Sequence, residues 1–419
     1  MQQRRMRRLI AAGALLAVAA CSAAAGPEPL PVEPTDPVEA ARAFVVDARI
    51  RRAALEASVS VADAPYNQLR LDHYSLAGAG IDDPLADWDF TPVVVRGAVR
   101  RLRVPAAEGE PAPEPFEAGQ MVAPSFHDEL DAWVAAGRLA FELCPIQVDA
   151  RFRSLRRGAD VARSFGLHVT DEGEVRGAVE LQVPDGRWVV ALTCAACHSS
   201  SDGDGRPVPG LPNPDLRIGE LLGTSDWQSG TVDVTPDEQW NPVRPADLRT
   251  VALQARLHHA GNLANGRIAR MIRIETLVAS HFGYEGRPDR LLVAATALYL
   301  ESLADELPAP DWSAPGAAEL TRECGGCHEG DAMAGPPVSV NIVGTDPAAT
   351  VGGTRGTGAY RTPSLRGVAE RRGLLHDGSA ADLAAVLRLA PSEHVGHDFG
   401  TGLPLATRRA IADFLGAAQ

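Results

Sequence analysis

The chain has 419 residues, which is enough for two or three domains with hydrophobic cores of their own. Its hydrophobic content of 45 % and charged content of 22 % are ordinary for a soluble globular protein. The formal net charge is −14 and the chain contains no lysine, so the acidic surface argues against nucleic acid as a partner. Such a surface suits a basic protein partner, or it serves solubility alone.

Residues 1–21 are typical of an export signal. Arginines between positions 4 and 8 precede an apolar run over 9–20, which is too short to be a typical spanning helix. The run ends in Val18-Ala19-Ala20-Cys21, which resembles a bacterial lipobox; the alternative is an ordinary signal peptide with an incidental cysteine. We therefore expect lipidation of Cys21 and an anchor on the periplasmic face of a bacterial membrane, with Ser22 favouring the outer membrane.

Residues 22–37 are rich in proline and predict an extended tether. An N-terminal region of helices and strands is then expected over 38–190. Asp36 and Pro37 have the pattern of a helix N-cap and first residue, and apolar spacing extends this helix to about residue 58. Strands are predicted over 91–95 and 99–104.

Two further elements are predicted in this region. Ser125-x-x-Asp128 is close to a capping box, and it opens a helix whose apolar face holds Leu130, Trp133, Val134, Gly137 and Phe141. A β-hairpin follows over 179–192, because apolar residues alternate on both sides of an Asp185-Gly186 turn. Its second strand runs almost directly into Cys194-Ala195-Ala196-Cys197-His198.

The same string returns as Cys324-Gly325-Gly326-Cys327-His328, after a helix predicted over 315–323. A Cys-x-x-Cys-His string is the attachment signature of c-type haem. Its spacing places both sulfurs on one edge of the porphyrin and lets the next side chain reach the iron. We therefore expect two covalently attached haem c groups, with His198 and His328 as the proximal iron ligands.

The ring Nδ1–H of each proximal His should donate to a backbone carbonyl. Pro336 is the expected supplier at the second string, and Pro209 or Pro212 at the first. Cys144 is the one cysteine left once lipid and haem are assigned, so no disulfide is available. We expect Cys144 to be a buried, inert thiol.

An internal repeat follows the two strings. Leu248-Arg249-x-Val251-Ala252 and Leu257-x-His259-x-Gly261 recur at one offset of 117 residues as Leu365-Arg366-x-Val368-Ala369 and Leu374-x-His376-x-Gly378. An apolar helix closes each unit, over 291–303 and over 405–415. The repeat predicts two similar helical haem units, over 191–308 and 309–419; the alternative is coincidence in a chain rich in Ala, Leu and Arg.

The second unit carries Arg361-Thr362-Pro363-Ser364-Leu365-Arg366-Gly367-Val368-Ala369 and then His376-Asp377-Gly378-Ser379. These strings resemble the bacterial di-haem cytochrome c peroxidase and MauG-like family, most clearly over 315–419. The resemblance implies a mainly α fold of two cytochrome c-like domains with one haem each, behind the α+β region. In the family one haem stores or relays an electron and the other binds peroxide; a Trp often lies between the haems, and Ca²⁺ between the domains.

The motifs do not identify the distal iron ligands. The peroxidases of the family have a distal Met after the His-Asp-Gly string, but in this chain no Met follows Met333. For the first haem the candidates are His258, His259, Met271 and His281, of which the repeat favours His281; a surface His is the alternative. For the second haem we rank His394 and His397 ahead of Met333, and the Tyr-ligated relatives add Tyr360. His259 and His376 share a repeat position, which indicates a structural role.

Two minor features have structural alternatives. Trp227 and Trp240 lie between the first haem string and its repeat element, so either could lie between the haems or be an ordinary core or surface residue. Asp202 and Asp204 resemble half a calcium loop, and the alternative is a solvated turn.

The ligands decide among the functions. Two His ligands favour electron transfer, whereas an open position on the iron permits peroxide or O₂ chemistry. The leading hypothesis is an exported di-haem c-type cytochrome lipoprotein that transfers electrons with a redox partner protein. The alternative is a di-haem peroxidase or MauG-like oxidase that takes a small oxidant such as peroxide. A zinc-binding export protein that uses the two CxxC pairs is a third hypothesis.

Overall fold

The computed structural model describes residues 32–58, 98–111, 113–114, 121–202, 205–224, 227–233, 241–281, 288–351, 357–390 and 396–417. Several predictions fall outside these ranges: the export signal with Cys21, most of the tether, the strand over 91–95, Asp204, Trp240 and His394.

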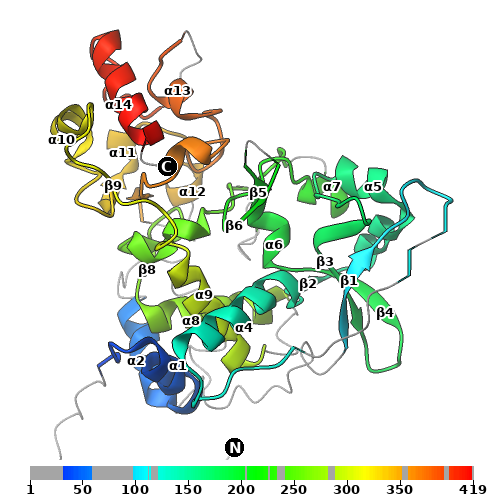
Figure 1. The fold of residues 1–419 in the computed structure, drawn as a ribbon. Helices are drawn as coiled ribbons and strands as arrows, with labels where there is room; N and C mark the ends of the chain where they lie inside the picture. The colour runs from blue at the N-terminus through cyan, green and yellow to red at the C-terminus, as the bar shows by residue number, and fades with distance from the viewer. Residues whose placement is uncertain are drawn as a thin grey trace, which may run out of the picture.

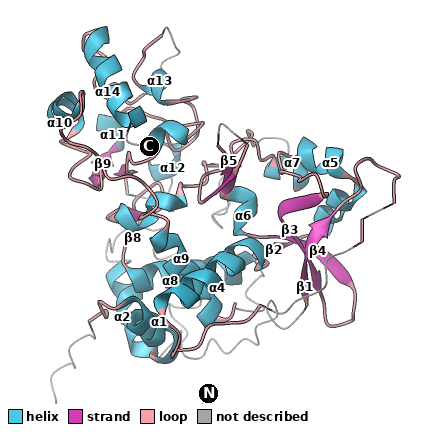
Figure 2. Ribbon diagram, in the orientation of Figure 1, coloured by secondary structure: helices cyan, strands magenta, loops and turns pink. Residues whose placement is uncertain are grey.

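The prediction of a mainly α fold built from two cytochrome c-like domains is wrong. The structure is about 40 % helix and 15 % strand, and its described residues include four small antiparallel sheets. The fold is therefore mixed α/β (Figure 2). The physical reason is that alternating apolar residues between β1 and β4 build a sheet that buries a core of its own.

A helical cluster forms the lower part of Figure 1. It consists of α1 (Pro37–Val46), α2 (Ala48–Ser58), α4 (Leu130–Leu143), α8 (Arg267–His281) and α9 (Arg290–Ser302). Residues 292–300 of α9 are all buried, because the other helices surround it. Gly137 allows α4 to lie against α9, since a Cβ at this position would be 2.0 Å from the Ala295 carbonyl oxygen. The helices that carry Leu130 to Phe141 and residues 291–303 are confirmed. The predicted capping box does not open α4, because Glu129 is its N-cap and the Ser125 N–H donates to the Asp128 carboxylate at 2.7 Å in the turn before it.

The single helix predicted over 37–58 is two helices. Asp36 caps the first as expected, because its Oδ1 accepts a hydrogen bond from the Glu39 N–H at 2.9 Å. Asp47 then has extended dihedral angles (φ −111°, ψ 105°) and ends α1. Its carboxylate accepts a hydrogen bond from the Arg49 N–H at 2.9 Å and so starts α2. An aspartate that bonds to its own backbone competes with a continuous helix.

A sheet cluster lies beside the helices, at the right of Figure 1. Its four antiparallel strands have the order β1 (Val99–Arg103), β3 (Glu174–Gln182), β4 (Trp188–Leu192) and β2 (Gln147–Val148). The predicted hairpin is confirmed as β3 and β4, and the strand over 99–104 as β1. The 3₁₀-helix η1 (Ala150–Arg157) and the helices α5 (Ala159–Ser164) and α7 (Ile218–Leu221) pack on one face of the sheet.

A C-terminal cluster forms the upper part of Figure 1. Its elements are α10 (Ala317–Cys324), β9 (Gly335–Ser339), α11 (Val340–Val343), α12 (Ala348–Val351), β10 (Ala359–Thr362), η3 (Val368–Glu370), α13 (Leu383–Val386) and α14 (Leu405–Ala417). Leu320, Ile411 and Phe414 join α10 to α14 in its core. The helices predicted over 315–323 and 405–415 are therefore confirmed.

Short elements connect the three clusters. They are α6 (Cys194–Cys197), β5 (Ser199–Ser201), β6 (Pro207–Pro209), η2 (Leu248–Leu253), β7 (Arg256–Leu257) and β8 (Leu263–Ala264). The sequence repeat has a local counterpart here. Leu257 pairs with Leu263, and at the repeat positions Leu374 pairs with Ala380. His258, which follows Leu257, has a left-handed φ of 61°, and Leu375, which follows Leu374, has a φ of 68°. The repeat therefore preserves a small turn, although the surrounding units differ.

Candidate functional site

The second Cys-x-x-Cys-His string lies at the end of α10, where the helix enters a tight turn. The His328 N–H donates to the Cys324 carbonyl at 2.9 Å, which brings His328 beside both cysteines. The His328 Nδ1 lies 3.2 Å from the Met333 carbonyl oxygen. Because a carbonyl can only accept, Nδ1 must carry the proton, which leaves Nε2 as the basic, metal-binding atom.

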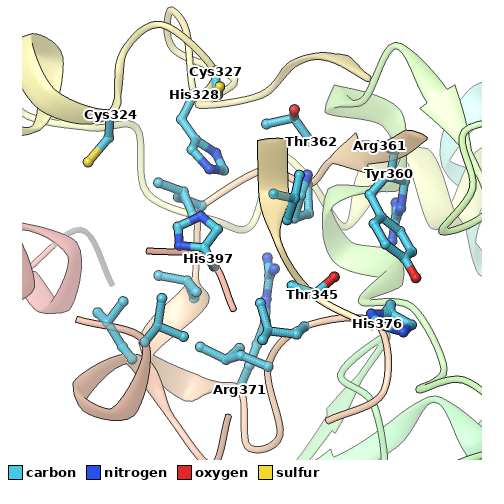
Figure 3. Close-up of a pocket in the computed structure, with 18 of the residues that line it drawn as sticks. Cys324, Cys327, His328, Thr345, Tyr360, Arg361, Thr362, Arg371, His376 and His397 are labelled. Carbon is cyan, nitrogen blue, oxygen red and sulfur yellow. The ribbon is translucent and has the colours of Figure 1, made fainter. Parts of the chain in front are cut away.

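The Cys324, Cys327 and His328 side chains line a cavity of about 460 Å³, drawn in Figure 3. This volume is in the range of small-molecule and cofactor pockets. Much of the cavity wall is aliphatic and comes from η3, α10, α13, α14 and the loops between them: Leu320, Leu365, Val368, Leu383, Val386, Leu387, Ile411 and Leu415. A flat, apolar group attached to the two thiols would therefore meet apolar side chains on several sides.

His397 lies inside the same cavity and faces His328. Figure 3 shows the two imidazole rings pointing toward one another. Its backbone has a left-handed φ of 54°, and its N–H donates to the Val343 carbonyl at 2.8 Å. Among the described residues its buried Nδ1 has no hydrogen-bond partner. Strained backbone and an unsatisfied ring nitrogen both point to a ligand in the cavity.

Both histidines are held in the neutral form that binds metal. Burial lowers the pKa of His328 to about 4; the neighbouring His397 contributes to this shift and the Met333 carbonyl opposes it. Burial also lowers the pKa of His397 below its ordinary value. A neutral imidazole binds iron without first losing a proton.

The other candidates near the second string have different roles. Met333 is fully buried in the C-terminal core and offers its carbonyl, rather than its sulfur, to His328. The Tyr360 hydroxyl donates to the Asp346 carbonyl, and its ring stacks on His376 with centroids 4.5 Å apart. His376 also lines the cavity, and its stacking on Tyr360 suits the structural role expected from the repeat.

The first string begins directly after β4, as predicted, and its short helix α6 lies between two cores. Ala195 packs in the helical cluster and Ala196 in the sheet cluster. Gly177 of β3 has a φ of 76°, and a Cβ at this position would be 2.3 Å from the Ala196 nitrogen. Only glycine allows the strand to approach the cysteine helix this closely.

His198 is oriented in the same manner as His328. Its Nδ1 lies 2.9 Å from the Ala246 carbonyl oxygen, so its Nε2 is again the metal-binding atom. Burial lowers the pKa of His198 to about 4, although Ala246 and Asp247 oppose this shift. The expected carbonyl donors, Pro209 or Pro212 at the first string and Pro336 at the second, are wrong. Backbone position relative to the folded turn, which is not visible in the sequence, selects Ala246 and Met333 instead.

Among the first-site distal candidates, His281 fits best. It ends α8, and its buried Nδ1 has no hydrogen-bond partner in the part of the chain that the structure describes. Burial lowers its pKa to about 4, and it lies close to the Ile146 backbone, next to the strand that leads into the first string. By contrast, His258 has both ring nitrogens engaged, with Asn262 at 2.7 Å and Arg273 at 2.6 Å.

The remaining first-site candidates have contacts that suit a structural role. Met271 is fully buried in the helical cluster. The Nε2 of His259 lies 2.7 Å from the Arg244 carbonyl, in agreement with the expected structural role. Trp227 packs on the core of the sheet cluster, which Cys197 also joins. Asp202 caps a turn by accepting from the Arg206 N–H at 2.8 Å, as expected of a solvated turn.

Cys144 is a buried thiol, as predicted. Burial raises its pKa to about 12, which keeps it protonated and unreactive. Within the described ranges no group of three or more His, Cys, Asp or Glu side chains could hold a metal ion without further ligands. No helix in those ranges is both long enough and apolar enough to cross a membrane.

Sequence reasoning missed the segment that joins the two strings. Residues 244–247 line the second cavity, while the Ala246 carbonyl binds His198 of the first string. Asp247 is buried and binds Arg249 at 2.8 Å and Arg371 at 2.7 Å, and Arg249 also pairs with Glu370. We call Asp247, Arg249, Arg361, Glu370 and Arg371 the buried arginine cluster. Ion pairs 124 residues apart leave no periodic signal in the sequence.

Comparison with known proteins adds no assignment, because no protein-family model and no curated protein matches the chain. The resemblance to the di-haem peroxidase and MauG-like family therefore depends on the sequence motifs alone.

Proposed function

We propose that the chain is a di-haem c-type cytochrome that transfers electrons, with haem attached at Cys324 and Cys327 and at Cys194 and Cys197. The observation that carries the proposal is the pair His328 and His397, which face one another across a cavity that also holds two free thiols. When bound, haem supplies a one-electron couple and a flat apolar surface.

The second cavity fits such a group on three independent grounds. Both thiols line it, and neither forms a disulfide. Among the described residues the buried Nδ1 of His397 has no hydrogen-bond partner. His328 is oriented through its Nδ1, which leaves its Nε2 for a ligand. The aliphatic wall would exclude water from the group.

The protein residues have distinct tasks in this proposal. His328 would be the proximal ligand, and the Met333 carbonyl would fix its tautomer and raise its basicity. His397 would be the distal ligand and would close the second coordination position. Two imidazole ligands give a low reduction potential and suit electron transfer.

The first string is assigned by the same chemistry. His198 is oriented by Ala246, and the buried ring of His281 is the best-supported distal candidate. The family resemblance leaves a peroxidase or MauG-like oxidase as the second candidate function. That function requires a haem iron with an open or displaceable ligand position. The first site is the candidate for it, because its distal ligand is less well supported than that of the second site.

The wider setting is proposed from the sequence. A lipid on Cys21 would anchor the chain on the periplasmic side of a bacterial membrane. Haem c attachment also requires export, because the cysteines are modified outside the inner membrane. The acidic surface suits a basic redox partner protein.

Purification of the full chain from a host with haem c maturation tests the proposal. We expect the alkaline pyridine spectrum to give two haems per chain and denaturing gels to retain them. The oxidised second haem should be low-spin with two imidazoles, and the reduced second haem should not bind CO. Absence of covalent haem would exclude the proposal; CO binding at both haems, or turnover of peroxide, would favour the oxidase alternative.

A further inference from the structure

Arg361 is a cation in the wall of the second cavity that has no ion-pair partner among the described residues. Arg361 lies on β10, where its backbone N–H donates to the His259 carbonyl at 2.9 Å and holds the strand in place. Its side chain lines the cavity, together with that of Arg371. Among the described residues no carboxylate lies within 4.0 Å of the Arg361 guanidinium, and its buried Nε has no hydrogen-bond partner.

The buried arginine cluster does not balance its charge. It contains three guanidinium groups, on Arg249, Arg361 and Arg371, but only the carboxylates of Asp247 and Glu370. Asp247 serves two arginines and Glu370 serves one, so Arg361 is left over. Burying a charge without a partner is costly. Accordingly, burial and the nearby Arg371 together lower the pKa of Arg361 to about 10, although the Asp247 charge opposes this shift.

We infer that Arg361, supported by Arg371, binds a carboxylate of the group that occupies the second cavity. The inference rests on the proposed function, in which that group is haem and the carboxylates are its propionates. A guanidinium is the side chain best suited to grip a carboxylate, because its N–H donors form a planar fork. The ligand would thereby supply the negative charge that the cluster lacks.

The layout of the cavity agrees with this orientation. Figure 3 shows Cys324 and Cys327 at one end, and Arg361 and Arg371 away from them. In haem the vinyl groups that bond to cysteine and the propionates lie on different edges of the porphyrin. Aliphatic side chains form much of the rest of the cavity wall. A ligand with an apolar body and an acidic edge matches this distribution of side chains.

Substitution of Arg361 in the full-length holoprotein tests the inference. Removing a buried positive charge from the wall of a cavity that would hold haem should favour the ferric state. We expect Arg361→Gln to change the ferric-to-ferrous equilibrium at least tenfold, which lowers the midpoint potential of the second haem by about 59 mV or more. Arg361→Lys keeps the charge and should restore most of the potential. Arg322→Gln is the matched control, because Arg322 is exposed on α10 and pairs with Glu323.

The outcomes separate this inference from the proposed function. If haem is attached but the potential of Arg361→Gln equals that of Arg322→Gln, the inference fails and the cytochrome assignment stands. If no haem is attached to the wild-type chain, the assignment itself fails. A wild-type potential that shifts with added chloride or phosphate would show that Arg361 binds a free anion, which overturns the propionate assignment.

If the Arg361→Gln variant does not accumulate, a spectroscopic measurement on the Arg361→Lys variant tests the inference instead. Redox-difference infrared spectra of wild type and Arg361→Lys should then differ in the carboxylate bands, because a bidentate guanidinium is exchanged for a single ammonium. Identical carboxylate bands in the two proteins would contradict the inference.

Discussion

The two Cys-x-x-Cys-His strings are alike in sequence but lie in different surroundings. The second ends a helix and opens into a cavity with a histidine on its far side. The first follows a β-strand and lies between the cores of the helical and sheet clusters. The same five-residue string can therefore follow a helix or a strand. In both places the string forms the same turn, in which the His N–H donates to the carbonyl of the first Cys.

What the two sites share is the treatment of the proximal histidine. His198 binds the Ala246 carbonyl, and Pro363, the repeat-equivalent residue, also places its carbonyl near His328. The next residues are equivalent as well. The Asp247 carboxylate accepts from the Arg249 N–H at 3.0 Å, and the Ser364 hydroxyl accepts from the Arg366 N–H at 3.2 Å. The repeat thus preserves the support of the histidine, not the shape of a domain.

The largest expected effect comes from removing the thiols of one string at a time. We expect Cys324→Ser with Cys327→Ser, and separately Cys194→Ser with Cys197→Ser, each to lose one of two covalent haems. The alkaline pyridine spectrum should therefore show half the wild-type absorbance per chain. Cys144→Ser is the control, because this thiol is buried and protonated, and it should keep both haems. Full haem content in either double variant would contradict the assignment of that string.

The next effect concerns the far side of the second iron. His397→Ala should convert the second haem from a low-spin to a high-spin state and should allow CO to bind after reduction, because the histidine that faces His328 across the cavity is removed. Electron paramagnetic resonance and CO difference spectra measure both changes. His127→Ala is a matched control on an exposed loop. A variant spectrum that equals the wild-type spectrum would point instead to His394, which lies outside the described residues.

Breaking the connection between the sites should destabilise the fold. Asp247 is buried and binds two arginines, one of which lines the second cavity. Removing one partner of a buried ion pair typically costs about 3–5 kcal/mol of unfolding free energy. We expect a loss of this size for Asp247→Asn in urea unfolding at pH 7. Asp215→Asn is the control, because its pair with Arg372 is exposed and should contribute about 1 kcal/mol or less.

The effect of Asp247 should depend on pH in a defined direction. Burial alone would raise its pKa, but Arg371 and Arg249 hold the pKa below its ordinary value. A lowered pKa contributes stability above the unfolded-state pKa of about 3.9, and this contribution is lost as the pH falls through the folded-state pKa. The difference between wild type and Asp247→Asn should therefore be full at pH 6–7 and should shrink below about pH 4. A difference that grows in acid would contradict this role.

The sequence could predict the local elements but not how they combine. Alternation and turn residues predicted the hairpin before Cys194, and apolar spacing predicted α4, α9, α10 and α14, because these signals are local. The Asp47 break was missed because one side-chain hydrogen bond ended an otherwise continuous pattern. The fold class was wrong because similar short motifs do not determine what surrounds them. His397 was among the candidates, but its position opposite His328 depends on the loop after α13, which no periodicity describes.

The smallest expected effect tests why a strand can carry the first string. Gly177→Ala would place a Cβ 2.3 Å from the Ala196 nitrogen at a φ of 76°. Left-handed strain costs about 1–2 kcal/mol and overpacking about 1–3 kcal/mol, so we expect a loss of about 2–5 kcal/mol in urea unfolding. Gly186→Ala in the hairpin turn is the control that measures the cost of the left-handed backbone alone. Its φ is 84° and no atom lies within 4 Å of the added Cβ, so about 1–2 kcal/mol should be lost. Equal losses in the two variants would show that β3 need not touch the cysteine helix; a larger loss for Gly177→Ala, with less haem bound at the first string alone, would show that this contact positions the first site.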